Sequence, residues 1–173
     1  MRVTQATILV IVFSLSIFIS ANNAVAQQKT KDYLLGSWMF VSAIAEGPTG
    51  EKTELFGPNP NGIMIFSKDG YFSLFQSRSE LPKIAANDRS KATPEEAKAI
   101  LHGAIAYYGT YSLNEPDKTI LVKVTASTFP NLAGPNEQKR IITSLTDEEL
   151  KFTNPRTPTG VTLYTTWKRA TSP

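Results

Sequence analysis

The chain has 173 residues and a net charge of +3 at pH 7, with 41% hydrophobic and 19% charged residues. This composition is typical of one globular domain and excludes an intrinsically disordered chain. Because the basic residues form no cluster, we expect no nucleic-acid partner. The sequence has no cysteine and a single histidine, which excludes disulfides and thiol catalysis and leaves little for a metal site or a Ser-His-Asp triad. We therefore assign no catalytic residue and expect no metal or cofactor.

The N-terminal segment has the pattern of a secretory signal. Arg2 gives a positive start, residues 8–19 form an apolar run, and Ala24-Val25-Ala26 is a cleavage site of the A-x-A type. The run is shorter than the roughly 20 residues that a transmembrane helix needs, so we expect no stable membrane insertion once residues 1–26 are removed. The expected product begins at Gln27 and is exported, to the periplasm or the medium. We expect residues 27–34 to be a mobile polar segment and residues 35–170 to form the domain.

Strands dominate the first part of this domain. Alternating residues predict a strand over 38–45 and a short strand over 53–56, and the prolines and glycines of residues 57–62 predict a loop. Residues 63–67 and 71–77 flank Lys68-Asp69-Gly70. An Asp-Gly pair between two apolar runs is a strong hairpin signal, so these two segments are predicted to pair as antiparallel strands.

One helix start interrupts the strands. Thr93, Pro94 and Glu96 have the spacing of a capping box with proline at the first helical position. The apolar residues that follow recur with helical spacing and predict a short helix over residues 94–101, which Gly103 would end. Because this helix lies between the fourth and fifth strands, we expect it to cover one end of the fold.

Five further strands are predicted after the helix, over residues 105–113, 118–125, 137–145, 149–153 and 161–169. Short turns join most of them, which favours an antiparallel meander. A meander of eight strands closes into an up-and-down barrel that is just wide enough to hold one small ligand. The predicted fold class is all-β: a closed eight- to nine-stranded antiparallel up-and-down barrel with one short inserted helix.

Closure of such a barrel brings its first and last strands together. Trp38 lies near the start of the first strand and Arg169 at the end of the last. We therefore expect a guanidinium over an indole face at the closed end, a favourable arrangement.

A glycine two residues before Trp38, together with a late arginine, is similar to the lipocalin signature. The chain as a whole resembles the lipocalin-like domain family of small bacterial and fungal proteins over about residues 33–170. The segments that carry this likeness are Pro58-Asn59-Pro60-x-Gly62-x-Met64, Asp69-Gly70-Tyr71, Tyr108-Gly109-Thr110-Tyr111, Ser127-Thr128-Phe129-Pro130-Asn131, Leu145-Thr146 and Trp167-Lys168-Arg169. The resemblance implies a barrel with an apolar cavity, and it brings no catalytic residues with it.

The candidate ligand site is built from side chains that could form a cavity wall, since Met adapts to irregular ligands and Tyr adds a hydroxyl. They are Met64, Phe66, Phe72, Tyr107, Tyr111 and Phe129, with Arg140 as a further candidate ligand-binding residue. Gly109, between two tyrosines of one strand face, either leaves space for a ligand or marks a bulge.

Two polar residues have alternative interpretations. Arg140 would pair with a ligand carboxylate if it faces inward, but Ile141 on the other face favours an outward, solvated arginine. His102 would be a general base in a pocket, or it would contact the C-terminal dipole of the helix, which we prefer.

The function predicted from these features is the binding of a small hydrophobic ligand inside an exported barrel, for sequestration or carriage, by a monomer or weak oligomer. One alternative is an isomerase- or cyclase-type enzyme acting on a hydrophobic substrate with the tyrosines and His102. Another is a filled barrel that acts as a protein-interaction or inhibitor module. A ligand-sized cavity would separate the first two from the third.

Overall fold

The structure is a computed structural model that describes residues 30–155, 157 and 160–171. The chain divides into two units, Met1–Tyr33 and Leu34–Pro173. In the first unit, the described residues 30–33 are helical, and the expected signal segment and cleavage site lie outside the described residues. The second unit contains the strands. In the part of the chain that the structure describes, no helix has the length and apolar character needed to cross a membrane.

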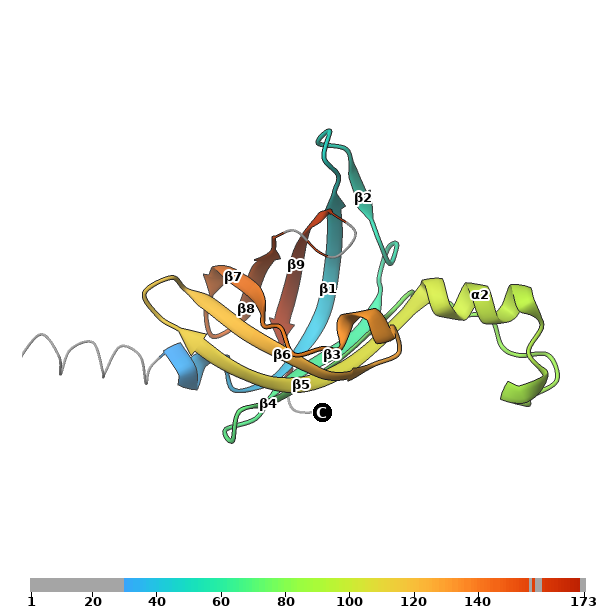
Figure 1. The fold of residues 1–173 in the computed structure, drawn as a ribbon, viewed down its shortest axis with the longest axis horizontal. Coiled ribbons are helices and arrows are strands. Elements are labelled where there is room, and N and C mark those ends of the chain that lie inside the picture. Colours follow the sequence, from blue (N-terminus) through green and yellow to red (C-terminus); the bar gives the residue numbers. More distant parts are fainter. Residues whose placement is uncertain (1–29, 156, 158–159, 172–173) are drawn as a thin grey trace, which may run out of the picture. The chain divides into compact units, whose positions relative to one another are not determined.

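Nine strands form one antiparallel sheet in the second unit (Figure 1). In chain order, the elements are β1 (Gly36–Glu46), β2 (Lys52–Glu54), β3 (Asn61–Phe66), β4 (Tyr71–Ser77), the 3-10 turn η1 (Arg89–Lys91), α2 (Pro94–Gly103), β5 (Ala104–Asn114), β6 (Thr119–Ser127), the 3-10 turn η2 (Pro130–Leu132), β7 (Gln138–Leu145), β8 (Glu149–Asn154) and β9 (Thr162–Arg169).

Pairing between the first and last strands closes the sheet. β1 pairs with β9 from Trp38 opposite Arg169 to Glu46 opposite Thr162, with a register shift between Phe40 and Ser42. The other edge of β1 pairs with β3 over its first residues and with the short β2 over its last. The result is a closed eight-stranded barrel with β2 as an extra strand, which confirms the predicted fold class.

The predicted hairpin is also present. β3 and β4 pair along their length, from Asn61 opposite Ser77 to Phe66 opposite Phe72. The turn between them includes Gly70 with φ of 89°, a left-handed conformation that favours glycine because it has no Cβ. In β4 the alternation is regular: Phe72, Leu74 and Gln76 are buried, and the residues between them are exposed.

The inserted helix α2 has the predicted cap. The side chain of Thr93 accepts a hydrogen bond from the backbone N–H of Glu96, and the Glu96 carboxylate accepts one from the N–H of Thr93. The expectation that this helix covers a barrel end is wrong. Figure 1 shows α2 extending outward from the start of β5, and Gly103 is its buried residue. The apolar face of α2 makes little contact with the barrel, and Leu101 on this helix is 60% exposed.

Candidate functional site

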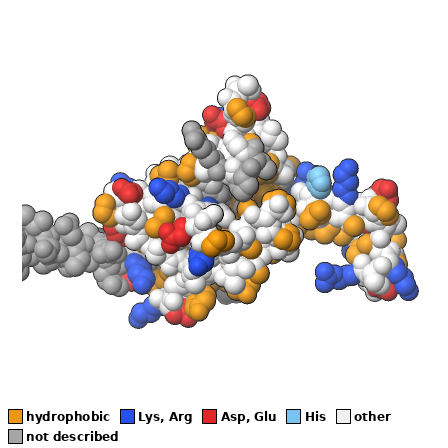
Figure 2. Space-filling view, viewed as in Figure 1, with side chains coloured by type: hydrophobic (Ala, Val, Ile, Leu, Met, Phe, Trp, Pro, Cys, Tyr) orange, Lys and Arg blue, Asp and Glu red, His pale blue; other side chains and the backbone are white. Residues whose placement is uncertain are grey.

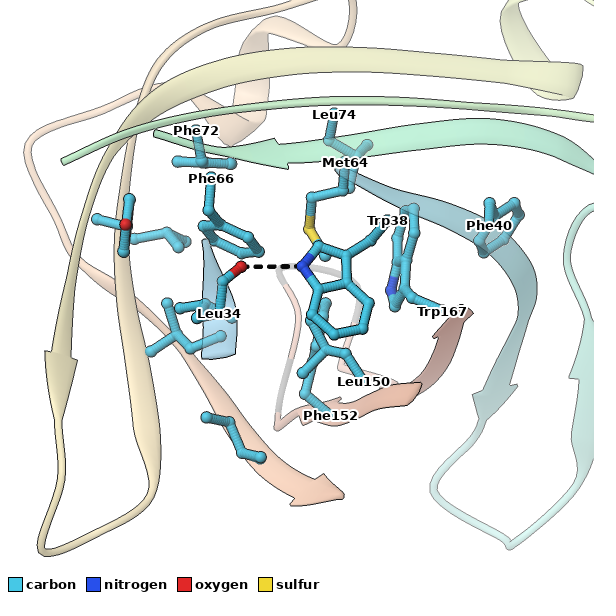
Figure 3. Packing of buried hydrophobic residues seen from close by; sticks show 14 of the residues in the cluster. Leu34, Trp38, Phe40, Met64, Phe66, Phe72, Leu74, Leu150, Phe152 and Trp167 are labelled. Atoms are coloured by element: carbon cyan, nitrogen blue, oxygen red, sulfur yellow. Dashed lines mark hydrogen bonds between the residues drawn. The ribbon is translucent and has the colours of Figure 1, made fainter. Parts of the chain in front are cut away.

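Large apolar side chains fill one end of the barrel. Figure 3 shows this packing, in which the indole Nε1 of Trp38 donates a hydrogen bond of 2.9 Å to the carbonyl oxygen of Leu34. Both residues are completely buried. Leu34 therefore belongs to the core, although its sequence position is at the end of the segment expected to be mobile.

The structure brings the predicted closure pair together at this end. The guanidinium of Arg169 lies 3.8 Å from the centre of the Trp38 ring, and its Nη1 donates to the carbonyl oxygen of Leu35 at 2.6 Å. Partial burial lowers the pKa of Arg169 from its usual value, and the charge of Asp147 opposes that shift. The guanidinium thus seals the edge where the first and last strands meet.

Four of the predicted cavity residues lie in this filled end. Phe66 contacts Phe72 and Tyr111 with ring centres 6.3 and 4.9 Å apart. The Tyr111 hydroxyl donates to the carbonyl oxygen of Ser67 at 2.8 Å. Met64 is 2% exposed within the same cluster. These side chains point inward from the neighbouring strands β3, β4 and β5 and occupy the barrel interior themselves, so they do not line the cavity described below.

The other end of the barrel holds a cavity of about 660 Å³. Its apolar lining includes Ala43, Leu74, Phe152 and Trp167, which extend the core toward the opening. Residues 131–137, which include the end of η2, line it as well. The segment between β6 and β7, not α2, thus borders this cavity.

Buried polar side chains line the cavity beside these apolar ones. Four strands contribute one residue each: Gln76 from β4, Arg140 from β7, Asn154 from β8 and Thr165 from β9. Each is between 6 and 8% exposed and each lines the cavity.

Gln76, Asn154 and Thr165 are not among the site residues expected from the sequence, although the alternation of inward and outward positions could have identified them. In β4 and β8 the inward positions change from apolar to polar along the strand, from Leu74 to Gln76 and from Phe152 to Asn154. In β9 the same inward face carries Thr165 and Trp167. Following one face of each predicted strand would have placed these polar residues inside the barrel.

Arg140 faces the barrel interior, so the preference for an outward arginine is wrong. Its side chain is 8% exposed, whereas the adjacent Ile141 is 38% exposed. Nη1 donates to the carbonyl oxygen of Lys139 at 3.1 Å and Nη2 to Oε1 of Gln138 at 3.0 Å. Among the described residues no carboxylate forms an ion pair with Arg140. The cavity thus contains a buried positive charge with no negative partner.

Three other lining residues have buried polar atoms without a hydrogen-bond partner. These atoms are Nε2 of Gln76, Oδ1 of Asn154 and Nε1 of Trp167. Most buried polar groups in proteins are hydrogen-bonded, so three such atoms on the lining of one cavity are unusual. The indole N–H and the guanidinium only donate hydrogen bonds, which makes the polar part of the cavity rich in donors.

The remaining predicted residues lie toward the open end. Tyr107 is half-buried, lines the cavity and packs edge-on against Phe72 at 5.9 Å between ring centres. Phe129 is 40% exposed and lines a second hollow of about 350 Å³. This hollow shares Leu55, Phe56 and Ile105 with the larger cavity.

The single histidine, His102, also lines this second hollow and does not line the larger cavity. It lies in the last turn of α2, pale blue in Figure 2. His102 is therefore at the helix C-terminus, where an imidazole can interact with the helix dipole, as the preferred interpretation of this residue expects.

Gly109 marks a bulge. The register between β5 and β6 shifts between Tyr108 and Gly109. A Cβ at position 109 would lie 1.9 Å from the carbonyl oxygen of Lys123. The missing side chain is therefore required by the close approach of β6, which accounts for this glycine without a ligand.

The fold and the cavity define a class of protein: a small up-and-down barrel, filled at one end and hollow at the other. The family model described as lipocalin-like domain matches residues 35–170, and the chain belongs to this family. No curated protein matches the chain.

Solved structures similar to the chain include designed barrels. A redesigned β-barrel has 18% identity and a TM-score of 0.43, covering 82% of this chain and 96% of that one. A second redesigned β-barrel, bound to DFHBI, has 17% identity and a TM-score of 0.40, covering 81% and 98%. A de novo designed fluorescence-activating β-barrel has 8% identity and a TM-score of 0.41, covering 81% and 96%.

Proposed function

We propose that the protein binds a small, largely apolar molecule in the barrel cavity, for sequestration or carriage. The observation that carries this proposal is the cavity itself, about 660 Å³ at one end of a barrel whose other end is filled. Ligand sites in proteins commonly have volumes of about 300–1,000 Å³ and mostly apolar walls with a few placed polar groups. A barrel serving only as a protein-interaction module would have no need of such a cavity.

The chemistry of the lining favours binding over acid–base catalysis. The charged side chain buried there is Arg140, and a guanidinium does not give up its proton under ordinary conditions. General acid–base chemistry needs a group that titrates near the working pH. The single imidazole of the sequence, His102, lines the second hollow instead.

The binding test uses a neutral fluorescent dye, Nile red, and a matched pair of variants. Tyr107 lines the cavity, whereas the next residue, Tyr108, is 48% exposed on the outer face. We expect the dye to bind the purified domain and Tyr107→Trp to weaken binding several-fold by filling space. Tyr108→Trp adds the same bulk outside the barrel and is expected to leave binding unchanged. Failure of the wild-type protein to bind any apolar probe would contradict the proposal and favour the filled-barrel alternative.

We further propose that the protein is exported. The support is the pattern of the first 26 residues: a positive start, a short apolar run and the small residues Ala24-Val25-Ala26. N-terminal sequencing of the protein from fractionated cells is expected to begin at Gln27. Recovery of the full-length chain from the inner membrane would contradict export.

A further inference from the structure

We propose that the ligand of the cavity is an apolar monocarboxylate, with its carboxylate held by Arg140 and its apolar body against the deeper side chains. This inference rests on the proposed function, since it names the chemical class of ligand for the same site. Its basis is the buried charge and the unsatisfied donors described above, not the volume of the cavity.

Burying Arg140 without a negatively charged partner has a cost in free energy. A charged group removed from water is destabilising unless an opposite charge or enough hydrogen bonds replace the lost hydration. Two acceptors from its own strand, the Lys139 carbonyl and the Gln138 side chain, engage its two terminal nitrogens. Both acceptors are neutral, so the charge itself stays uncompensated. A ligand carboxylate would supply the missing negative charge.

In the part of the chain that the structure describes, the acidic residues near the cavity do not compensate the charge of Arg140. Glu137 also lines the cavity, but this residue is exposed and its carboxylate forms no ion pair with Arg140. The buried polar residues of the described chain include no Asp or Glu. The protein therefore leaves the guanidinium available to an anion that enters from outside.

The neighbouring strand β8 and the rest of the lining determine which polar groups surround the guanidinium. β7 and β8 pair with Ile141 opposite Thr153, and continuing this register by one residue places Arg140 beside Asn154. Asn154 is buried and its unpaired atom, Oδ1, is an acceptor, so the unpaired donors of the lining are Nε2 of Gln76 and Nε1 of Trp167. These two N–H groups and the guanidinium are the donors that the cavity offers to one planar anion. The hydrogen bonds from Arg140 to its own strand also hold the guanidinium in place before the ligand arrives, which lowers the entropy cost of binding.

The buried charge of the lining matches a ligand with a single negative charge. Arg140 is the buried cation of the lining, and Lys139, although it also lines the cavity, is exposed. One guanidinium matches one carboxylate, and the pair forms two parallel hydrogen bonds. A phosphate monoester would bring a second negative charge with no buried partner. The apolar body of the ligand would then contact Leu74, Phe152 and Trp167, which line the same cavity.

The experiment compares two ligands that differ in charge and share an apolar chain. Decanoate and decan-1-ol are titrated at pH 8 and fixed ionic strength into the wild-type protein loaded with Nile red, and dye displacement is followed. We expect decanoate to bind about 10- to 100-fold more tightly than decan-1-ol, the range for a hydrogen-bonded charge pair. Arg140→Met is expected to abolish this preference.

The matched control is Lys123→Met, which removes the same charge from an exposed residue of β6 that does not line the cavity. It is expected to keep most of the preference, because an exposed charge is screened by water and salt. If Arg140→Met fails to fold, Arg140→Gln is used in its place. The comparison of decanoate with decan-1-ol on the wild-type protein tests the inference without any variant.

The outcomes separate the two proposals. If neither decanoate, decan-1-ol nor the dye binds, the proposed function fails. If the wild-type protein binds the two ligands equally, or if a folded Arg140 variant keeps the preference for decanoate, the cavity binds apolar molecules but the carboxylate inference is overturned.

Discussion

Arg169 lies across the indole ring of Trp38, 3.8 Å from its centre, and the two residues are directly opposite each other in the pairing of β1 with β9. The same guanidinium donates to the carbonyl oxygens of Leu35 and Asp147, at 2.6 and 3.1 Å. One side chain thus contacts the segment before β1, the indole on β1 and the turn before β8. This arrangement ties together the edges at which the sheet closes.

Breaking this contact is expected to destabilise the barrel. Trp38→Ala should lower the free energy of unfolding by about 3–5 kcal/mol, the usual range for removing a large buried aromatic side chain. Arg169→Ala should cost about 1–3 kcal/mol through its lost hydrogen bonds and packing. Lys168→Ala, at the exposed neighbouring position, is the control and should stay within about 0.5 kcal/mol of wild type. Urea unfolding measures all three, and wild-type stability of both Trp38→Ala and Arg169→Ala would contradict the closure argument.

Tyr111 predicts an alkaline loss of stability. Burial raises the pKa of its hydroxyl above the usual value of 10.0, and the charge of Asp69 adds to that shift. Because the pKa is higher in the folded than in the unfolded state, the stabilisation is complete below about pH 10 and is lost as pH rises through the folded value. Tyr111→Phe should cost about 0.5–1.5 kcal/mol at pH 7 for the lost hydrogen bond to Ser67.

The measurement is urea unfolding between pH 8 and pH 11. The stability difference between wild type and Tyr111→Phe should shrink above pH 10. Tyr108→Phe, at an exposed position, is the control and should follow the wild-type curve. A constant difference between wild type and Tyr111→Phe over this range would contradict the role given to burial.

Gly109→Ala tests the bulge between β5 and β6. The added Cβ would lie 1.9 Å from the carbonyl oxygen of Lys123 and 3.0 Å from the backbone nitrogen of Thr125. Because both atoms belong to the backbone, the strands must separate, and we expect a loss of at least about 1–3 kcal/mol in thermal or urea unfolding. Gly134→Ala is the matched control, since no atom lies within 4 Å of its added Cβ. Equal stabilities of the two variants would show that the bulge does not require glycine.

Glu96 predicts an acid-sensitive start of α2. Hydrogen bonds from the backbone N–H groups of Ala85 and Thr93 lower the pKa of its carboxyl below the usual 4.5. The stabilisation is therefore present above pH 4.5 and is lost as pH falls through the folded value. We expect the hydrogen-exchange protection factors of α2 amides to fall at low pH and Glu96→Gln to lower them already at neutral pH. Glu95→Gln is the control, and the same effect from both variants would point to net helix charge instead of this cap.

The sequence predicted those parts of the structure that depend on neighbouring residues. Asp69-Gly70 fixes the hairpin because glycine tolerates the positive φ of the turn, and Thr93 with Glu96 fixes the helix start because each satisfies a free backbone N–H of the other. The closed barrel also follows from the sequence, since short turns between successive strands leave β1 and β9 to pair.

Arg140 shows what local reasoning could not decide. Ile141 and Ile142 follow it directly, so β7 has apolar residues on both faces and alternation does not identify the inner one. In the structure, β7 pairs with β6 and β8 in a register that places Arg140 and Ile142 on the inner face of the barrel. Ile141 lies on the outer face and is 38% exposed.

The position of the cavity was likewise decided by tertiary structure. The sequence alone determined that alternate residues of eight strands line the interior and that many of these residues are aromatic. It did not determine that Phe66, Phe72 and Tyr111 meet at one height and fill that end, whereas Gln76, Asn154 and Thr165 meet at the other. The reason is physical: the free volume inside a barrel depends on which side chains from different strands share a level, and inter-strand register sets that level.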